Sequence, residues 1–521
     1  MSMRAGRGLR TGVVLPLCFL LGGCLAWVDK LGETVGPDYV PPENTDLPAD
    51  YAGPAPEPLP EQARSEEGLV EDEETAGREN RGRTIGVSRD WWRAFGDPLM
   101  TDLIDRALAD NPVVRQADSR VIEARAFVRA ARAGEEPTLD LDADAGVEGR
   151  RTYADPESAE SRTLGGVAGL SAVFDWTLDL FGAVERETQA AEADLRRLEA
   201  ERGDIALATA ADVARRYTDV RASQIRLSLA DQAIELQQES LGLVEGRVDS
   251  GLASQLDLTR ARAELAAFQA DRAPVRGELR ANLAALAVLT GAPPGDLPPA
   301  VEREGALPML GVGPDYGVPL DMVRRRPDIA AAEQAIVAAT AEIGVAEAAL
   351  YPAFRLPGEI GIDLSDIATG ELVTSIVGSL FLAIDAPLAD GGLREAELEA
   401  ARARAQEAVH AYRETLLAAL EEVETALETL AAARQQVISL EEATVASRQA
   451  FQQAQDRYRE GLASYLDVLD AQRVLVDRRL ALTEARAEMT RQAITLYQAT
   501  GLGVPRRPDE ARDGEEAANR I

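Results

Sequence analysis

Few residues in this 521-residue chain are of a type that carries out chemistry. It contains one histidine, His410, and two cysteines, Cys18 and Cys24. His410 falls in the middle of a predicted helix, where it is most simply a solvated or packed side chain. The sequence shows no metal-ligand cluster, no nucleophile constellation and no phosphate-binding glycine loop. We therefore expect a protein that is not an enzyme and that binds neither a cofactor nor a metal.

Cys24 stands at the end of a processing signal. Arginines near the N-terminus precede the short apolar stretch Thr11–Leu21. The run Leu21-Gly22-Gly23-Cys24 then resembles the lipobox of bacterial lipoproteins. We expect a signal peptide at 1–23 and lipid attachment at Cys24, with a plain secretory signal and an incidental cysteine as the alternative. Leu25 stands where the inner-membrane lipoproteins of enteric bacteria resemble one another in carrying Asp, which favours sorting to the outer membrane.

Composition excludes some partners and predicts some shape. The formal net charge is −34, so nucleic acid is an improbable partner, because its binding depends on basic residues that neutralise phosphates. Aromatic residues make up only 4% of the chain, which is typical of long helices and coiled coils. The acidic, proline-rich stretch within 24–90 and the tail 506–521 contain too little apolar surface to order themselves.

The chain is one long unit written twice. Gly182–Gly291 recurs as Gly392–Gly501 at a constant offset of 210 residues. The clearest block is RVDSGLASQLDL at Arg247–Leu258 against RYREGLASYLDV at Arg457–Val468. Internal repeats fix an architecture, so we expect one domain over 91–505, with repeat one at 91–291 and repeat two at 320–501.

Helical periodicity covers most of both repeats. The longest run, Ala183–Val248, predicts a helix about 100 Å long at about 1.5 Å per residue. Two shorter runs in the same repeat sum to about the same length, so one long helix can lie beside two stacked short ones. The remaining predicted helices are Asp102–Ala133, Leu256–Thr290, Met322–Leu350, Leu393–Arg459 and Leu466–Thr500. Lengths and small residues together favour the wall of a tube over a compact core.

Two segments alternate apolar and polar residues and therefore read as strands, at about 138–181 and 353–390. Each segment predicts one hairpin, so the chain supplies four strands. No stretch after the signal reaches about 18 uninterrupted apolar residues, so we expect no membrane-spanning helix. A spanning structure must then be a closed β-barrel, and the smallest need about eight strands. We expect a homotrimer in which the helices continue a twelve-stranded barrel as a long helical barrel. The fold class is mainly α with a small β part.

Several motifs in this order resemble those of the TolC-like outer membrane factors, in particular the NodT-type lipoprotein branch. They run almost from end to end and include VGPDYVPP at Val35, WWRAFGDPLMTDLIDRALADNP at Trp91, LDLFG at Leu178, RRPDIAAAEQAIVAATAEIGVAEAALYP at Arg325, PLADGG at Pro387 and GLASYLDVLDAQ at Gly461. The resemblance implies a homotrimeric exit duct in the outer membrane that extends into the periplasm. It also implies two partners, a periplasmic adaptor (membrane fusion protein) and an inner-membrane pump of the resistance-nodulation-division type. The long acidic insertion before Trp91 departs from the pattern.

The repeated turns GLASQLD and GLASYLD are the best candidates for a working part. Gly251 and Gly461 are free to adopt positive φ and end one helix, and Ser254 and Ser464 are suited to cap the next. Two well-capped hairpin turns are the simplest interpretation. The resemblance implies more: these turns, with Leu252 and Leu462, form the periplasmic tip where the tube closes and the adaptor docks.

Four further residues match the gate of the family. Asp467 and Asp470 match the paired aspartates that ring the constriction, so threefold symmetry implies six carboxylates whose mutual repulsion raises some of their pKa values. Such a ring attracts cations and is blocked when they bind. Asp257 and Tyr458 match a pair whose hydrogen bond holds the closed state. A capping Asp and a packed Tyr explain the same two residues almost as well.

Two other functions remain as alternatives. A periplasmic lipoprotein adaptor has one helical hairpin between β-rich halves, whereas this chain has two hairpins and places its strands between helices. A purely structural coiled-coil scaffold needs neither the alternating strands nor the Gly-Ser turns. We therefore expect an export duct that opens at its periplasmic tip.

Overall fold

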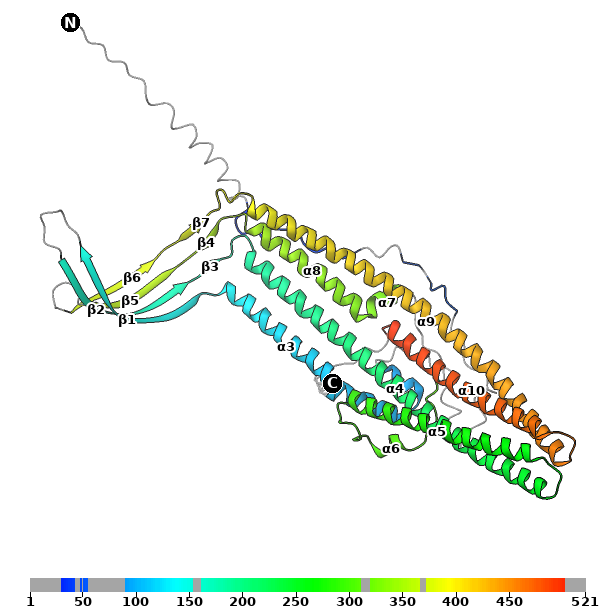
Figure 1. Cartoon of the computed structure of the whole chain (residues 1–521). Helices are drawn as coiled ribbons and strands as arrows, with labels where there is room; N and C mark the ends of the chain where they lie inside the picture. Colours follow the sequence, from blue (N-terminus) through cyan, green and yellow to red (C-terminus); the bar gives the residue numbers. More distant parts are fainter. Residues whose placement is uncertain are drawn as a thin grey trace, which may run out of the picture. The chain divides into compact units, whose positions relative to one another are not determined.

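The computed structural model describes residues 30–42, 47–48, 50–54, 90–152, 161–310, 319–365 and 372–501 (Figure 1). The predicted signal 1–23, Cys24, most of the stretch 24–90 and the tail 506–521 lie outside the described residues. The chain divides into two compact units. The first comprises Met1–Pro42, Val121–Arg197 and Ala332–Tyr412, and the second comprises Glu43–Arg120, Leu198–Ala331 and Arg413–Ile521.

The first unit contains both sheets. Strands β1 (Thr138–Thr152), β2 (Ser161–Asp175), β5 (Gly358–Ser365) and β6 (Val373–Leu380) form an antiparallel sheet in the order β1-β2-β5-β6. Three short strands form a second sheet in the order β3-β4-β7, and they are β3 (Thr177–Leu178), β4 (Ala353–Arg355) and β7 (Ala383–Asp385). The pairing of β2 with β5 joins a strand from each repeat.

The strands lie where alternation predicted them, but three of the four are interrupted. Pro357 separates β4 from β5, because proline has no N–H to give to a ladder. Its carbonyl instead accepts a hydrogen bond from Phe381 N at 3.0 Å, where β6 gives way to β7. Trp176 separates β2 from β3, and its carbonyl accepts from Leu356 N at 2.8 Å. Each hairpin is therefore continued by a short strand rather than by one unbroken ribbon.

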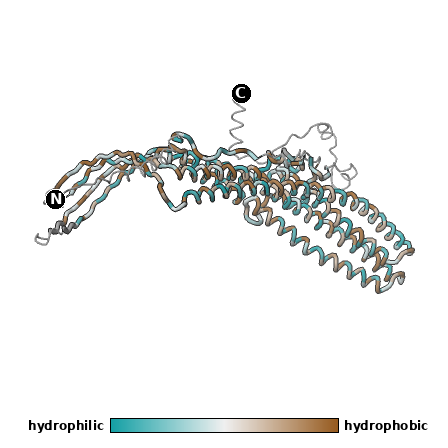
Figure 2. The backbone as a smooth tube through the Cα atoms, turned by 90° about the horizontal axis from the view of Figure 1, so that it is seen from above, coloured by the Kyte–Doolittle hydropathy of each residue, from teal (hydrophilic) through white to brown (hydrophobic). Residues whose placement is uncertain are grey.

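The two faces of the larger sheet differ in chemistry. Asp144, Gly169, Asp363 and Ser375 lie opposite one another across β1, β2, β5 and β6. The same face holds five further carboxylates, which belong to Asp140, Asp142, Glu148, Asp175 and Glu359. The other face presents exposed apolar side chains, which are Leu139, Leu141, Leu170, Ile360, Ile362, Ile376 and Leu380. Figure 2 shows the resulting alternation of hydrophilic and hydrophobic residues along the strands.

Long helices make up most of the rest. α4 (Ala183–Asp249) and α9 (Leu393–Arg459) each contain 67 residues, which gives about 100 Å at 1.5 Å per residue. This confirms the two long predicted helices. α5 (Gln255–Leu289) and α10 (Tyr465–Ala499) contain 35 residues each and confirm the two shorter ones. The short elements are η3 (Trp91–Phe95), η4 (Ala133–Glu135), α6 (Pro299–Glu302) and α7 (Pro319–Arg325).

Two predicted helices are wrong as single segments. The segment Asp102–Ala133 divides into α2 (Pro98–Asp110) and α3 (Pro112–Arg132), since Asn111 adopts an extended conformation with φ −62° and ψ 126°. A residue before proline is pushed out of the helical region by the proline ring. Met322–Leu350 divides in the same way, into α7 and α8 (Pro327–Ala348).

α8 is long and apolar enough to cross a membrane by length and composition alone. Its most apolar window has a mean hydropathy of 1.4, and 39% of that window is buried within the protein. The sequence led us to expect no such helix among the residues after the signal. Within the first unit Ile343 of α8 packs against Leu398 and Ala401 of α9. A helix packed in a protein core meets the same criterion, so this feature is weak support for a membrane span.

The described part of the N-terminal segment makes polar contacts in each unit. In the first, Arg186 donates to the carbonyl oxygens of Val35 (3.0 Å) and Gly36 (3.2 Å). In the second, the backbone N–H groups of Ala52 and Gly53 donate to the Glu424 carboxylate at 2.8 and 2.7 Å. The segment is thus held by polar contacts before the acidic insertion, at Val35 and Gly36, and within its first residues, at Ala52 and Gly53.

The aromatic residues at the start of the folded region pack into the second unit. Trp91 and Trp92 are 2% and 1% exposed. The Trp91 ring stacks on Tyr497 of α10, with ring centroids 5.2 Å apart. The two tryptophans therefore belong to the core of the second unit.

Candidate functional site

The two repeated turns lie at the same end of the second unit (Figure 1). One joins α4 to α5 and the other joins α9 to α10. The residues expected at the tip, Gly251, Leu252, Ser254, Gly461, Leu462 and Ser464, therefore come together at this end. Both turns are built from the same local chemistry.

Each long helix ends in a Schellman motif. Gly251 N donates to Val248 O at 2.9 Å, and Leu252 N donates to Arg247 O at 2.7 Å. Gly251 has a φ of 70°. Glycine adopts this conformation without steric cost, whereas a residue with a side chain would be strained there. The second turn repeats these bonds from Gly461 N to Tyr458 O (3.0 Å) and from Leu462 N to Arg457 O (2.7 Å), with φ 79° at Gly461.

The following helices both begin with a capping box. Ser254 Oγ accepts from Asp257 N at 3.2 Å, and Asp257 Oδ2 accepts from Ser254 N at 3.3 Å and from its hydroxyl at 2.8 Å. Ser464 and Asp467 form the same box, with distances of 3.3, 2.8 and 2.8 Å. The sequence predicted the serine caps, and the structure adds the reciprocal aspartates.

Asp467 and Asp470 are both exposed and lie one turn apart on the same face of α10. Hydrogen bonds from the side chain and backbone of Ser464 hold the pKa of Asp467 below its usual range. This direction is opposite to the one expected from repulsion within a ring of carboxylates. In a single chain the hydrogen bonds from Ser464 therefore determine the direction in which the pKa of Asp467 shifts.

The expected hydrogen bond between Asp257 and Tyr458 is not formed in this structure. Asp257 Oδ2 is occupied by Ser254, and Tyr458 Oη is buried with no hydrogen-bond partner among the described residues. Tyr458 is only 4% exposed. Burial, which disfavours the phenolate, raises its pKa, and the Asp257 charge contributes in the same direction. The two residues are neighbours without being bonded.

Arg247 instead connects the two turns, a role that we did not expect from the sequence. Its Nη1 donates to the carbonyl oxygens of Tyr458 (2.8 Å) and Arg459 (3.3 Å) at the end of α9. Its guanidinium also stacks over the Tyr458 ring, 4.7 Å from the ring centroid. A cation at the carbonyl end of a helix is favourable. The available signal was an arginine four residues before the turn glycine in both repeats, at Arg247 and Arg457.

The surface of the tip is apolar as well as acidic. Leu252 and Leu256 are 69% and 56% exposed in the first turn, and Leu462 and Leu466 are 65% and 51% exposed in the second. Exposed leucines that cluster on a helical tip are typical of a protein–protein contact.

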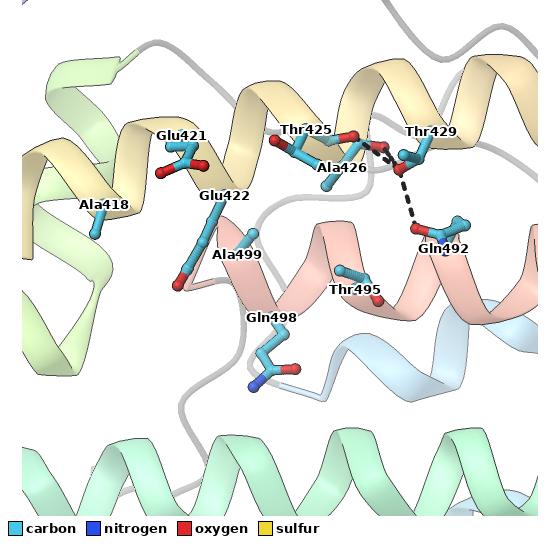
Figure 3. Close-up of a pocket in the computed structure, with 10 residues that line it drawn as sticks. All are labelled: Ala418, Glu421, Glu422, Thr425, Ala426, Thr429, Gln492, Thr495, Gln498 and Ala499. Carbon is cyan, nitrogen blue, oxygen red and sulfur yellow. Dashed lines mark hydrogen bonds between the residues drawn. The ribbon is translucent and has the colours of Figure 1, made fainter.

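A cavity of about 600 Å³ lies between α9 and α10, away from the turns (Figure 3). Glu421, Glu422 and Thr429 of α9 line it, and Thr429 donates to Gln492 of α10 at 3.0 Å. Glu422 also pairs with Arg326 at 2.7 Å. Among the described residues, no group of three or more His, Cys, Asp or Glu side chains is arranged to hold a metal ion.

Known proteins are similar to this chain in sequence and in fold. The family model of the outer membrane efflux protein matches residues 103–292 and 319–502, which correspond to the two repeats. The chain is 29% identical over 484 residues to Nodulation protein T of Rhizobium leguminosarum bv. trifolii, covering 93% of this chain and 95% of that protein. It is 31% identical over 487 residues to the Cation efflux system protein CusC of Escherichia coli O6:H1, covering 93% and 99%.

Solved structures of outer-membrane channels have the same fold as this chain. The outer-membrane channel OprN superposes with a TM-score of 0.77 at 30% identity, covering 90% of this chain and 99% of that chain. The structure of CusC superposes with a TM-score of 0.72 at 26% identity, covering 90% of this chain and 99% of that chain. The matched ranges and the shared fold lead to one conclusion: the chain belongs to the outer membrane efflux protein family and is an outer-membrane efflux channel protein.

Proposed function

We propose that three copies of the chain form the exit duct of a tripartite system and that the duct opens at the end where the two turns lie. A periplasmic adaptor docks on this end and an inner-membrane pump of the resistance-nodulation-division type supplies the substrate. The single observation that carries the proposal is the paired tip: two matching capped turns, each with exposed leucines, at one end of the helices.

The sheet supports the membrane part of the proposal. Its apolar face suits lipid, and its opposite face carries carboxylates without a basic residue among the paired positions from Thr138 to Val147. Gly169 lies between Asp144 and Asp363, and a side chain there would meet their Oδ1 atoms at 2.5 and 3.2 Å. A water-filled lumen lined in this way favours cations. Lipid on Cys24 would anchor the same chain to the outer membrane.

The tip carboxylates supply the closing element. Under threefold symmetry Asp467 and Asp470 contribute six carboxylates around one aperture. Asp467 is charged at neutral pH, as an ordinary aspartate is, and the Ser464 cap lowers its pKa further. A charged ring holds divalent cations, which close the aperture by occupying it. Arg247 and Tyr458 lie at the same end and hold the two hairpins together, and Asp257 caps α5 beside them.

Docking of the adaptor is assigned to Leu252 and Leu462. Family membership favours the channel over a periplasmic adaptor or a coiled-coil scaffold, and a channel needs a partner at its periplasmic end. The two leucines are repeat-related and more than half exposed, so one adaptor surface fits both turns.

Site-specific photo-crosslinking in intact cells tests this assignment. A photoreactive residue at Leu252 or Leu462 is expected to trap a periplasmic adaptor encoded by the same organism. The matched control is Leu417, which is 58% exposed in the middle of α9. Adaptor adducts from Leu417 and none from the turns would overturn the assignment.

A further inference from the structure

We propose that Gln472 and Gln237 form a polar layer inside the core of the tip, and that this layer keeps the packing of the four helices weak enough for the tip to open. The inference rests on the proposed function and adds two gating residues to it.

Gln472 of α10 has unmet hydrogen-bonding capacity. It is 0% exposed, and neither its amide oxygen nor its amide nitrogen has a partner among the described residues. Near the tip, the buried residues of α10 around it include Val468, Leu469 and Leu475. Burying an amide without partners opposes folding, because its hydrogen bonds to water are lost and not replaced.

Gln237 of α4 is a partly satisfied counterpart. It is also 0% exposed, and its Nε2 donates to Ala261 O of α5 (2.8 Å) and Tyr465 Oη of α10 (3.0 Å). Its Oε1 has no partner among the described residues. Gln237 therefore links three helices while leaving one polar atom unpaired. Breaking that link removes one connection of α10 to α4 and α5, which the Arg473–Glu264 ion pair and the apolar packing still join to it.

Other unpaired polar atoms gather in the same region. Ser240 Oγ on α4 and Tyr458 Oη on α9 are buried, each residue being 4% exposed, and neither has a partner in the described part of the chain. Farther from the tip, the same kind of residue is satisfied. Gln224 of α4 is 5% exposed, donates to Val301 O at 2.9 Å and accepts from Arg221 at 2.8 Å.

The repeat shows that a helical hairpin does not require these glutamines. The positions 210 residues away are Arg262 for Gln472 and Ser447 for Gln237. Ser447 lies in a helix that forms equally well, and its hydroxyl bonds to Ala443 O of its own helix at 2.8 Å. The amides therefore serve something other than hairpin formation. A tip that loosens admits water to them, which lowers the free-energy difference between the packed and loosened states.

The test compares two Gln→Leu changes in the full-length trimer. Gln472→Leu removes unpaired atoms and adds apolar contact, so we expect hydrogen exchange of the peptide around 465–475 to slow by about tenfold and the open probability to fall by a similar factor. Gln237→Leu also removes two hydrogen bonds that are made, so exchange at the tip is expected to speed up and the channel to leak. The control is Gln453→Leu at an exposed position of α9, which should change neither.

Two results would overturn the inference. Faster exchange in Gln472→Leu would mean that the amide is satisfied by buried water and stabilises the tip. Slower exchange with an unchanged open probability would mean that the layer has no part in gating. Both results leave the proposed function intact if the native trimer conducts; a folded native trimer that forms no channel would overturn both.

Discussion

Removing the Arg247 side chain should loosen the tip. In Arg247→Ala the carbonyl oxygens of Tyr458 and Arg459 lose a charged donor, and the Tyr458 ring loses a stacked cation. These contacts connect the end of α4 to the end of α9. Their loss leaves the two turns joined mainly through the core behind them.

The magnitude follows from the geometry. A hydrogen bond from a charged donor contributes about 1.5–3 kcal/mol, and a cation–π contact contributes about 0.5–1 kcal/mol at an exposed site. One of the two bonds is long at 3.3 Å and Arg247 is only half-buried, so the lower end applies. We expect about 2 kcal/mol in total. At about 1.4 kcal/mol per factor of ten, the population of the loosened tip rises about thirtyfold.

Single-channel recording in planar bilayers measures this population as open probability, and thermal unfolding of the trimer measures the lost stability. Arg262→Ala is the matched control, because Arg262 forms an exposed pair with Glu245 at 3.0 Å near the same turn. Exposed pairs contribute about 0–1 kcal/mol, so the control should barely change either quantity. An Arg247→Ala trimer that conducts like the control would show that Arg247 does not hold the tip closed.

Three further predictions concern caps and charges. Gly461→Ala should cost about 1–2 kcal/mol of unfolding free energy because φ is 79° there, whereas Gly246→Ala within α4 should stabilise the protein by about 0.5–1 kcal/mol; denaturation of both variants checks the opposite signs. The pKa of Asp467 is lowered in the folded protein, so the stabilisation from its cap is fully present above the ordinary Asp pKa of about 4. That stabilisation is lost as the pH falls through the lower pKa of the folded state. Ser464→Ala should raise the pKa of Asp467, which a carboxyl-carbon NMR titration measures. Arg326→Met should lower the unfolding free energy by about 1.5–3 kcal/mol, because the guanidinium loses its bonds to Asp328 and Glu422, whose side chains are 28% and 56% exposed and stay solvated. An unchanged melting temperature would contradict this.

Periodicity was enough to predict the long helices and the strands. A 67-residue helix repeats its small and apolar positions often enough that one misleading residue changes little. The breaks depended on single residues. Asn111 is extended because Pro112 follows it, and its side chain then bonds to Leu289 O at 2.8 Å. Pro112 and Pro327 each interrupt a helix through a single residue, which a periodicity measured over many residues does not reveal.

The candidate site was predictable where the bonds are local. Each capping box joins two residues three positions apart, so the serine caps were predictable from the sequence alone. The contact of Arg247 with Tyr458 joins residues 211 apart and depends on how two hairpins pack. The unpaired amide of Gln472 depends on the same packing. Such features require the tertiary structure.

The chain is an outer-membrane efflux channel protein, and we propose that an acidic aperture at its tip closes the channel. The most direct test is single-channel conductance of the purified full-length trimer in a planar bilayer, with and without divalent cations. We predict small, cation-selective currents that divalent cations block, and relief of that block when Asp467→Asn and Asp470→Asn are combined. Protein that is folded and trimeric but forms no channel would contradict the assignment of this chain as a conducting duct.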